Sequence, residues 1–384
     1  MRFEFATATR IVFGPGTLSE AGALVAPWGR KALVVTGMHP ERAQPLRDSL
    51  DRQGVGSEVF PIEGEPTVPA VQSALEMARD CGAELVVGFG GGSAIDAAKA
   101  VAGFLTNPGD PLDYLEVVGG GQSLPNPAAP WIAIPTTAGT GAEVTRNAVL
   151  GVPGRGVKVS LRSPHLLARI ALVDPELTLD LPPAVTAMTG MDALTQLLEA
   201  YVCNRANPLT DAICSAGLAR SGRALPSVWR NPRDLDARTD LALSSLWSGL
   251  ALSNAGLGAV HGFAAPIGGL FSAPHGAVCA ILLVPVMEMN LRVAREKTSG
   301  TATVARYTEI ARWLTGRCDA SAKDGIAWVR DLVASLRIPR LASHGVAPEN
   351  VNDIVVRAKS ASSMKANPVA LTDQQLAEVI ASAI

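Results

Sequence analysis

Four residues in the second half of the chain have the side chains and spacing of a divalent-metal site. Asp192 and Gln196 are four residues apart in a stretch with helical periodicity, so both side chains project from one helix face. His261 and His275 flank a Gly- and Pro-rich segment, residues 262–274, which can turn back and bring both imidazoles to the same point. One carboxylate with two imidazoles suits Fe(II) or Zn(II). Spacing alone favours the plainer alternative, in which Asp192 caps or pairs locally and the histidines are ordinary core or loop residues.

A glycine-rich run follows an apolar strand and opens a helix. Its sequence over residues 88–99 is GFGGGSAIDAAK. Consecutive glycines let backbone N–H groups approach a diphosphate closely, and a helix N-terminus adds partial positive charge. The run differs from the usual G-x-G-x-x-G fingerprint because Ser93 occupies the third glycine position. Phosphate binding is the favoured interpretation, and a tight strand-to-helix turn is the alternative.

A second polar loop, PTTAGTG over residues 135–141, also follows an apolar strand directly. Its hydroxyls and glycines would form a polar rim at the carboxyl edge of a parallel sheet, where open α/β folds bind ligands. An ordinary Ser/Thr/Gly loop is an equal alternative for this stretch alone. Lys158, in the strand-like stretch VKVSL, could neutralise a cofactor phosphate, but considered alone it is better explained as a solvated edge charge.

Strand-like and helix-like segments alternate over the first 180 residues. Apolar, β-branched runs predict strands at 31–36, 84–89, 131–135 and 170–173, with helical spacing at 41–53, 68–82 and 93–105. Nearly continuous apolar strands that alternate with helices are typical of a parallel sheet covered on both faces.

The pattern changes after Asp174-Pro175, where β-branched runs give way to Ala- and Leu-rich helical segments. We therefore predict an α/β domain over residues 1–180 and an all-helical domain over residues 181–384, with a ligand in the cleft between them. The expected helices of the second domain are 183–203, 207–224, 234–255, 258–271, 276–290, 300–315, 321–336, 347–361 and 372–383.

Composition excludes several classes of protein. The 384 residues are 48% hydrophobic and carry a formal charge of −2, which leaves no electrostatic footprint for nucleic acid or an anionic membrane. Apolar runs such as 278–289 are shorter than the ~18 residues that span a bilayer. The five cysteines have no C-x-x-C spacing, which indicates a reduced, cytoplasmic protein. Four of them are expected to pack as small hydrophobic residues: Cys81, Cys203, Cys214 and Cys279.

Taken together, these motifs resemble the iron-dependent (group III) alcohol dehydrogenase family, whose fold is shared with dehydroquinate synthase and glycerol dehydrogenase. The resemblance covers essentially the whole chain. It includes RIVFGPGTLSEAG, GGGSAIDAAK, IPTTAGTGAEVT, ALVDPELT, GMDALTQLLEAYV, GAVHGFAAPIGG and NPVALTDQQL, in that order. The fold that it implies is an α/β dinucleotide-binding domain followed by an all-α domain for metal and substrate.

The cofactor that the resemblance implies is NAD(P)(H). In this family the GGGS loop holds the cofactor diphosphate and the PTTAGTG loop lies beside it. The cofactor-binding residues implied here are Gly37, Gly90, Gly91, Gly92, Ser93, Thr136, Thr137, Thr140 and Lys158.

The family's catalytic metal is held by an aspartate and three histidines. Asp192, His261 and His275 match three of these ligands and are the expected catalytic residues, whereas Gln196 stands at the position of the fourth. An amide oxygen is a poorer partner than imidazole for Fe(II) or Zn(II), so metal affinity should fall. The resemblance favours Fe(II) over Zn(II), and a site without metal, as in the related maleylacetate reductases, is the alternative.

Two further positions depart from the family pattern. Ala265 stands where many relatives carry a histidine near the nicotinamide, so proton relay through that side chain is lost, and bound water or a ribose hydroxyl is the expected route. Gly37 stands where relatives that prefer NAD often carry an aspartate after the second strand. Such an aspartate would repel the 2′-phosphate of NADP(H). Because it is absent here and His39 and Arg42 are near, we predict that NADP(H) is accepted.

The predicted function is therefore an NAD(P)-dependent oxidoreductase that interconverts an alcohol and its aldehyde or ketone by metal-assisted hydride transfer. One alternative is a metal-independent reductase of an oxo-acid or enoyl group, similar to maleylacetate reductase, although no arginine cluster for a dicarboxylate is evident. Another is a non-enzymatic dinucleotide-sensing module. The expected partner is a small-molecule substrate, and the resemblance implies a homodimer to which residues 1–15 contribute.

Overall fold

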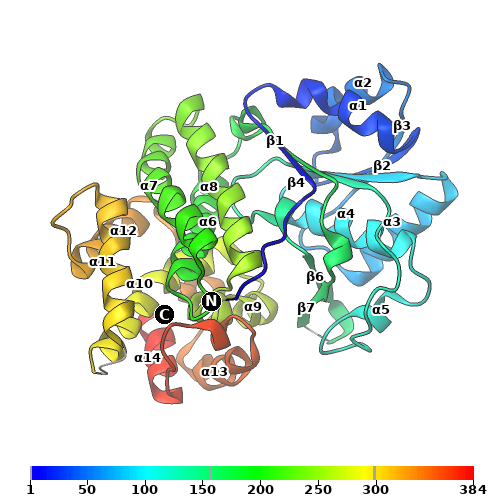
Figure 1. Cartoon of the computed structure of the whole chain (residues 1–384). Helices are drawn as coiled ribbons and strands as arrows, with labels where there is room; N and C mark the ends of the chain where they lie inside the picture. Colours follow the sequence, from blue (N-terminus) through cyan, green and yellow to red (C-terminus); the bar gives the residue numbers. More distant parts are fainter. Residues whose placement is uncertain (1, 156, 297–299) are drawn as a thin grey trace. The chain divides into compact units, whose positions relative to one another are not determined.

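The computed structural model describes residues 2–155, 157–296 and 300–384 (Figure 1). The chain divides into two compact units. The α/β unit consists of Ala6–Thr137 and Gly141–Leu179. The helical unit consists of residues 2–5, Ala138–Thr140 and Asp180–Ile384, so three residues of the PTTAGTG loop belong to it.

The α/β unit is built on a six-stranded sheet in which every described pair of neighbouring strands is parallel. The strand order is β1-β8-β5-β4-β2-β3. Its central strands are buried along almost their whole length, as the continuous apolar runs predict. The strands are β1 (Arg10–Phe13), β2 (Lys31–Thr36), β3 (Gly56–Pro61), β4 (Leu85–Gly90), β5 (Trp131–Pro135) and β8 (Ile170–Val173).

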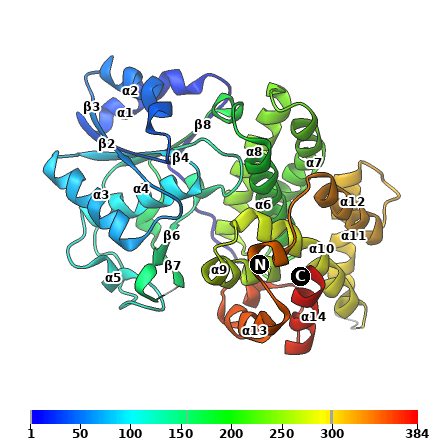
Figure 2. The same ribbon diagram turned by 180° about the vertical axis from the view of Figure 1, so that it is seen from behind.

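Helices cover both faces of this sheet. In Figures 1 and 2, α1 (Ala21–Val25) and α2 (Gln44–Asp51) lie on one face, and α3 (Val68–Asp80) and α4 (Gly92–Leu105) lie on the other. Alternate strand residues, such as Val34 and Val87, form one core with the first pair of helices. The unit is completed by the short helix α5 (Pro111–Tyr114) and by an antiparallel hairpin of β6 (Asn147–Val152) and β7 (Val157–Arg162).

The strand order creates a switch point between β2 and β4. After β2 the chain moves outward to β3, and it then returns to form β4 on the other side of β2. Loops that follow the two strands on either side of such a point separate and leave a crevice at the carboxyl ends of the strands. The residues directly after β2 and β4 are Gly37 and Gly91.

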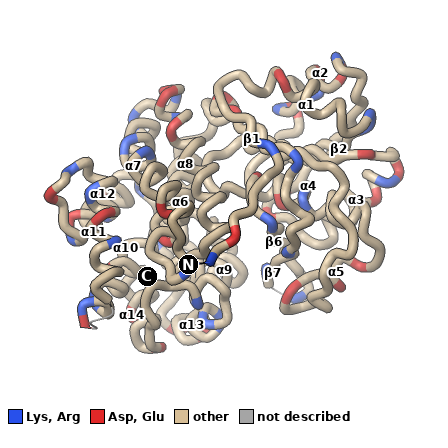
Figure 3. Tube along the Cα trace, in the orientation of Figure 1, with Lys and Arg blue, Asp and Glu red and all other residues tan. Residues whose placement is uncertain are grey.

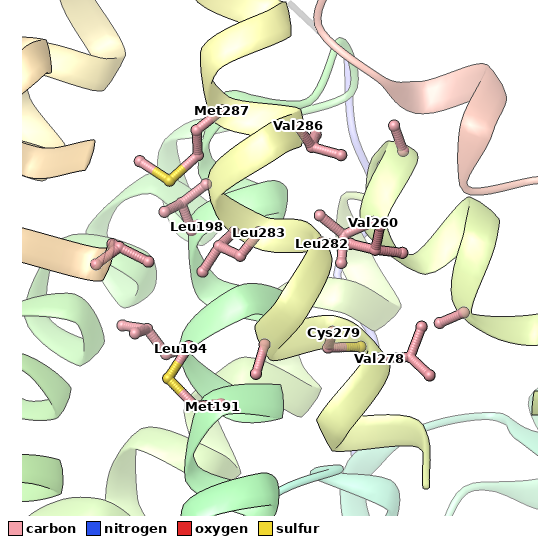
Figure 4. Packing of buried hydrophobic residues seen from close by; sticks show 14 of the residues in the cluster. Met191, Leu194, Leu198, Val260, Val278, Cys279, Leu282, Leu283, Val286 and Met287 are labelled. Carbon is pink, nitrogen blue, oxygen red and sulfur yellow. The ribbon is translucent and has the colours of Figure 1, made fainter. Parts of the chain in front are cut away.

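The helical unit forms its own core, in which α6 and α10 are central. Figure 4 shows Leu283 of α10 directed toward Leu198 of α6, and Leu282 directed toward Val260 of α9. The helices are α6 (Pro183–Val202), α7 (Pro208–Arg230), α8 (Leu235–Asn254), α9 (Ala259–Phe271), α10 (His275–Arg295), α11 (Thr301–Thr315), α12 (Ala322–Ser335), α13 (Val351–Ser360) and α14 (Asp373–Ala383). Acidic and basic residues are interspersed along both units (Figure 3).

Helix α10 is the one helix of the described residues that is long and apolar enough to cross a membrane by itself. It has 21 residues and a mean hydropathy of 1.7 over its best window. Inside the fold, however, 72% of that window is buried. Its apolar side chains are therefore explained by packing in the core of the helical unit.

The predicted helices of the second half are present, and the differences lie at their ends. Helix α7 continues to Arg230, six residues beyond the expected end at 224, and contains Pro226. Val228, two residues after this proline, is buried in the core of the helical unit. Helix α10 likewise passes through Pro285 and ends at Arg295 rather than near 290.

Candidate functional site

Three predicted metal ligands converge within the helical unit. Asp192 lies in the middle of α6, His261 in the first turn of α9, and His275 at the first residue of α10. Oδ1 of Asp192 is 3.2 Å from Nε2 of His261 and 3.6 Å from Nε2 of His275. The donor atoms of these three residues and of Cys279 all lie within 4.8 Å of one another.

The turn between α9 and α10 brings the two histidines together. Helix α9 ends at Phe271, the next residue, Ser272, has a φ of 51° that reverses the chain, and α10 begins at His275. At Gly276, a Cβ atom would lie 2.2 Å from the carbonyl oxygen of Met188, so only glycine lets α10 approach α6 this closely. The imidazole rings of His261 and His275 consequently lie 5.4 Å apart, centroid to centroid.

Glu199, which sequence reasoning did not single out, contacts His261 at the ring nitrogen that is directed away from Asp192. Its carboxylate accepts a hydrogen bond from the backbone N–H of Val260 at 2.7 Å and faces Nδ1 of His261 at 2.7 Å. Donation from Nδ1–H to this carboxylate leaves Nε2 directed at Asp192 as a potential metal donor. The signal in the sequence was its spacing, because Glu199 lies seven residues, or two helical turns, after Asp192.

Gln196 is buried beside this cluster, one turn after Asp192 on α6. Its Oε1 accepts a hydrogen bond from the hydroxyl of Ser248 on α8 at 2.7 Å. Its amide also helps to lower the pKa of the Asp192 carboxyl. The structure thus places Gln196 between Ser248 and Asp192, with its oxygen on the serine.

Cys279 packs in the core of the helical unit, as expected, and is also part of the cluster. It is fully buried, as expected, but its Sγ lies 3.7 Å from Nε2 of His261. The signal that could have found it is the four-residue spacing from His275 on one helix.

The electrostatics of the four side chains are coupled. Burial by itself raises the pKa of Asp192 and of Cys279, but the imidazole charges outweigh burial and lower both pKa values. Burial by itself lowers the pKa of His275, but Cys279 and Asp192 outweigh it and raise that pKa to about 9. Two anionic and two imidazole donors around one point form a donor set that fits a divalent metal ion.

In the α/β unit, the glycine-rich run and the threonine loop meet at the carboxyl edge of the sheet. Gly90 pairs with Pro135, and the N–H of Thr136 donates to the carbonyl of Gly90 at 2.8 Å. Helix α4 begins at Gly92, and no side chain among the described residues caps its N-terminus. Thr36, at the end of β2, is buried, and within the described part of the chain its Oγ1 has no hydrogen-bond partner. Free N–H groups and an unpartnered hydroxyl at a switch point fit a dinucleotide diphosphate.

The remaining predicted cofactor residues are distributed more widely. Thr137 lies against Gly91, where a Cβ atom would meet its Oγ1 at 3.4 Å. Thr140 belongs to the segment Ala138–Thr140 of the helical unit. Lys158 on β7 pairs with the half-exposed Glu65 at 3.2 Å.

The two residues considered as partners for a 2′-phosphate are both exposed. Nδ1 of His39 lies 3.1 Å from Oε1 of Glu41, and Arg42 donates to the carbonyl of Leu177 at 3.1 Å. At Gly37, between them and β2, an added Cβ atom would meet open space.

Lys99, from the glycine-rich motif, is a buried cation that sequence reasoning did not assign. Its Nζ lies 2.6 to 2.9 Å from the carbonyl oxygens of Ala142 and Asn147 and 2.8 Å from Oγ1 of Thr145. It also pairs with Asp96 at 3.3 Å. Lys99 therefore ties α4 to the segment that follows the threonine loop.

Glu143, in that same segment, gives a prediction about pH. Burial raises the pKa of this carboxyl from 4.5 to about 7. A carboxyl whose pKa is raised on folding stabilises the fold below pH 4.5, and that contribution is lost as pH rises through about 7. Glu143→Gln cannot ionise, so we expect it to match the wild type near pH 4.5 and to be more stable by ~3 kcal/mol at pH 8.

Urea unfolding of both proteins between pH 5 and pH 8 measures this difference. The exposed residue Glu58 supplies a control, because Glu58→Gln should leave the pH dependence of the wild type unchanged. A constant stability difference between Glu143→Gln and the wild type across this range would contradict the prediction.

Comparisons with known proteins agree with the geometry of both units. The family model "Iron-containing alcohol dehydrogenase" matches residues 8–175, and the model "Fe-containing alcohol dehydrogenase family, C-terminal" matches residues 186–384. A probable alcohol dehydrogenase, EutG of Salmonella typhimurium, is 38% identical over 341 residues, which cover 88% of this chain and 83% of the relative.

Solved structures show the same fold over the full length. A 1,3-propanediol oxidoreductase is 31% identical and superposes with a TM-score of 0.93, covering 100% of both chains. Sulfoacetaldehyde reductase from Bifidobacterium kashiwanohense, solved in complex with NAD+, is 28% identical with a TM-score of 0.88 over 100% of this chain and 99% of that one. Family models that match nearly the whole sequence, together with these structures, show that the chain belongs to the iron-containing alcohol dehydrogenase family.

Proposed function

We propose that this enzyme transfers a hydride between NAD(P)(H) and the carbonyl carbon of a small aldehyde or ketone, and catalyses the reverse reaction on the alcohol, with a divalent metal ion held in the helical unit. Alcohol–aldehyde interconversion is the activity of its family. The observation that carries the proposal is the convergence of Asp192, His261 and His275 from three helices.

The cofactor part of the proposal rests on the carboxyl edge of the sheet. The backbone N–H groups of Gly92 and Ser93, at the start of α4, would hold the diphosphate, with Thr136 beside them. The nicotinamide supplies or accepts the hydride when the cofactor is bound. Lys158, whose present partner is the half-exposed Glu65, would add positive charge on the cofactor side.

The metal part rests on the donor set. Asp192, His261 and His275 would hold the ion, and Gln196 is the fourth candidate from the sequence, with its oxygen on Ser248. A bound divalent ion acts as a Lewis acid toward a carbonyl or alkoxide oxygen. Glu199 keeps the imidazole of His261 in the orientation and tautomer that present Nε2.

The proton that the substrate oxygen gains or loses cannot pass through the side chain at position 265. Ala265 lies on the exposed side of α9 and offers no group that titrates. We propose that the proton moves between the substrate oxygen and solvent through bound water or a ribose hydroxyl of the cofactor.

The absorbance of NADPH during reaction with a panel of simple aldehydes tests the proposal. Protein reconstituted anaerobically with Fe(II) or Zn(II) is compared with protein stripped by a chelator, and each sample is assayed with NADH as well. We expect oxidation of the cofactor only in the metal-loaded samples. Equal rates in both would instead support a metal-independent reductase, and tight cofactor binding without reduction of any carbonyl would support a sensing role.

The same assays measure cofactor choice. Because Gly37 leaves no carboxylate at the end of β2 and Arg42 is exposed nearby, we expect NADPH to be used at least as well as NADH. A preference for NADH above ~100-fold, which corresponds to ~2.7 kcal/mol, contradicts this expectation.

We also propose a cytoplasmic homodimer to which the N-terminal segment contributes. Strand β1 is an edge strand of the sheet, and Ile11 on it is 36% exposed. An unpaired strand edge is a natural surface for pairing with a second chain. Light scattering of the purified enzyme measures its mass, and a monomeric mass contradicts this assembly.

A further inference from the structure

The metal cluster contains one donor more than the three on which the proposed function depends. Cys279 is fully buried, and its Sγ lies 3.7 Å from Nε2 of His261. This sulfur, the two imidazoles and the Asp192 carboxylate present one donor atom each, all within 4.8 Å of one another. The question is whether Cys279 or Gln196 is the fourth ligand.

Three of the separations between donor atoms match those of a tetrahedral site. With ordinary Zn–N, Zn–O and Zn–S bond lengths, the donor atoms of a tetrahedron are separated by ~3.3 Å between nitrogen and oxygen and ~3.6 Å between nitrogen and sulfur. The corresponding distances here are 3.2 Å from His261 to Asp192, 3.6 Å from His275 to Asp192, and 3.7 Å from Cys279 to His261. These three pairs of donors are thus already separated as ligands of one ion would be.

Helix α10 supplies two of these donors from one rigid element. His275 and Cys279 are four residues apart and therefore lie on the same face, one turn from each other. The side chain of His275 is 41% exposed, whereas those of Asp192 and His261 are 3% and 6% exposed. The cluster is accordingly accessible at His275, and Cys279 lies at its buried end.

Gln196 is a weaker candidate for the fourth position. Its oxygen, the atom that would bind a metal, accepts a hydrogen bond from Ser248 at 2.7 Å. It lies one turn after Asp192 on the same helix, where it can support that ligand.

Charge balance favours the thiolate. Among the ligands themselves, a carboxylate and a thiolate neutralise a divalent ion, whereas a carboxylate and an amide leave one positive charge for the Glu199 carboxylate behind His261 to balance. An unbalanced charge that is removed from water is costly.

We propose that Cys279 is the fourth metal ligand and that the resulting Asp192–His261–His275–Cys279 site binds Zn(II) in preference to Fe(II). The inference rests on the proposed function only in assuming that this cluster binds a divalent ion. Soft thiolate ligands favour zinc among the ions available to such a site, and Zn(II) accommodates tetrahedral geometry and a fifth donor without electronic cost. Gln196 then acts as a positioning residue for Asp192.

Cobalt(II) substitution of the full-length protein tests the ligand directly. Thiolate-bound Co(II) has a strong sulfur-to-cobalt charge-transfer absorption in the near ultraviolet, which carboxylate, amide and imidazole ligands do not produce. We expect this band in the wild type and in Gln196→Ala, and we expect its loss in Cys279→Ser. Cys214→Ser is the matched control, because Cys214 is equally buried in the same unit and is not one of the four clustered donor residues.

Competition with a chelator for zinc supplies a second readout. Cys279→Ser should lower Zn(II) affinity by more than ~10-fold, the least that loss of a supporting residue around a metal typically costs. Cys279→His should keep Zn(II) affinity near that of the wild type and still lack the charge-transfer band. This variant keeps the test valid if Cys279→Ser does not fold. Metal analysis after exposure to equal Zn(II) and Fe(II) should show zinc in the wild type and a weaker preference in Cys279→His.

The outcomes separate the two proposals. Wild-type protein that binds Co(II) without the band, or that loses affinity only in Gln196→Ala, overturns the role of Cys279 and leaves the metal-dependent function intact. Wild-type protein that binds neither Co(II) nor Zn(II) overturns both. If the protein binds iron in preference to zinc but its Co(II) form shows the charge-transfer band, only the proposed preference for Zn(II) is overturned.

Discussion

Asp192→Ala is expected to lower kcat for aldehyde reduction by ~10³-fold or more, because loss of metal-based charge stabilisation removes ~4 kcal/mol from the transition state. Asp192 is central to the cluster, since its Oδ1 is within 3.6 Å of both imidazoles. The glycine-rich run and Thr136–Thr137 belong to the α/β unit, so the affinity for NADPH should be nearly unchanged. Steady-state rates and fluorescence titration with NADPH measure the two effects separately.

Asp353→Ala provides the matched control. Asp353 is a half-exposed aspartate on α13 of the same helical unit, and it pairs with Arg357 at 2.9 Å. Its replacement should leave kcat and metal content near those of the wild type. Turnover by Asp192→Ala at the wild-type rate would refute the catalytic role of the cluster, and loss of NADPH binding in that variant would indicate a folding defect instead.

Lys99→Met is expected to destabilise the α/β unit by ~3–5 kcal/mol, the usual cost of leaving one partner of a buried ion pair alone. Lys99 is fully buried, and its Nζ faces four oxygens, including a carboxylate oxygen of Asp96. Burial lowers the pKa of Lys99 against the opposing influence of Asp96. Methionine fills similar space but satisfies none of these oxygens, and urea unfolding monitored by circular dichroism measures the loss.

Two companion variants make this result interpretable. Lys158→Met removes a lysine whose partner, Glu65, is 53% exposed, so it should cost less than ~1 kcal/mol. Adding Asp96→Leu to Lys99→Met should recover part of the lost stability, because it removes the unpaired buried charge. If Lys99→Met lowers the free energy of unfolding no more than Lys158→Met does, the buried pair of Lys99 and Asp96 does not stabilise the fold.

The α/β architecture could be predicted from sequence because buried parallel strands are continuous apolar runs. The runs at 31–36 and 131–135 coincide with β2 and β5 residue for residue. Of the hairpin, the strand-like stretch around Lys158 is β7, but β6 and the pairing were not predicted, since both strands are half-buried and mix glycine or charged residues with apolar ones. Local patterns identify strands whose burial is complete and miss those whose burial depends on a partner element.

The candidate site could be predicted only for residues that carry distinctive chemistry. Asp192, His261 and His275 stand out because charged and imidazole side chains are unusual in apolar helices. Cys279 and Glu199 were missed for different reasons. A cysteine in an apolar helix is most often a packing residue, and a glutamate in α6 looks solvated until the fold shows that α9 begins beside it.

The position of Glu199 also bears on whether metal loss is reversible. One carboxylate both satisfies the N–H of Val260, in the first turn of α9, and restrains the ring of His261. The ring is therefore in place before any ion arrives, and little conformational entropy is left to lose when one binds. We therefore expect the metal to leave and rebind the folded protein, so that loss of the metal inactivates the enzyme reversibly.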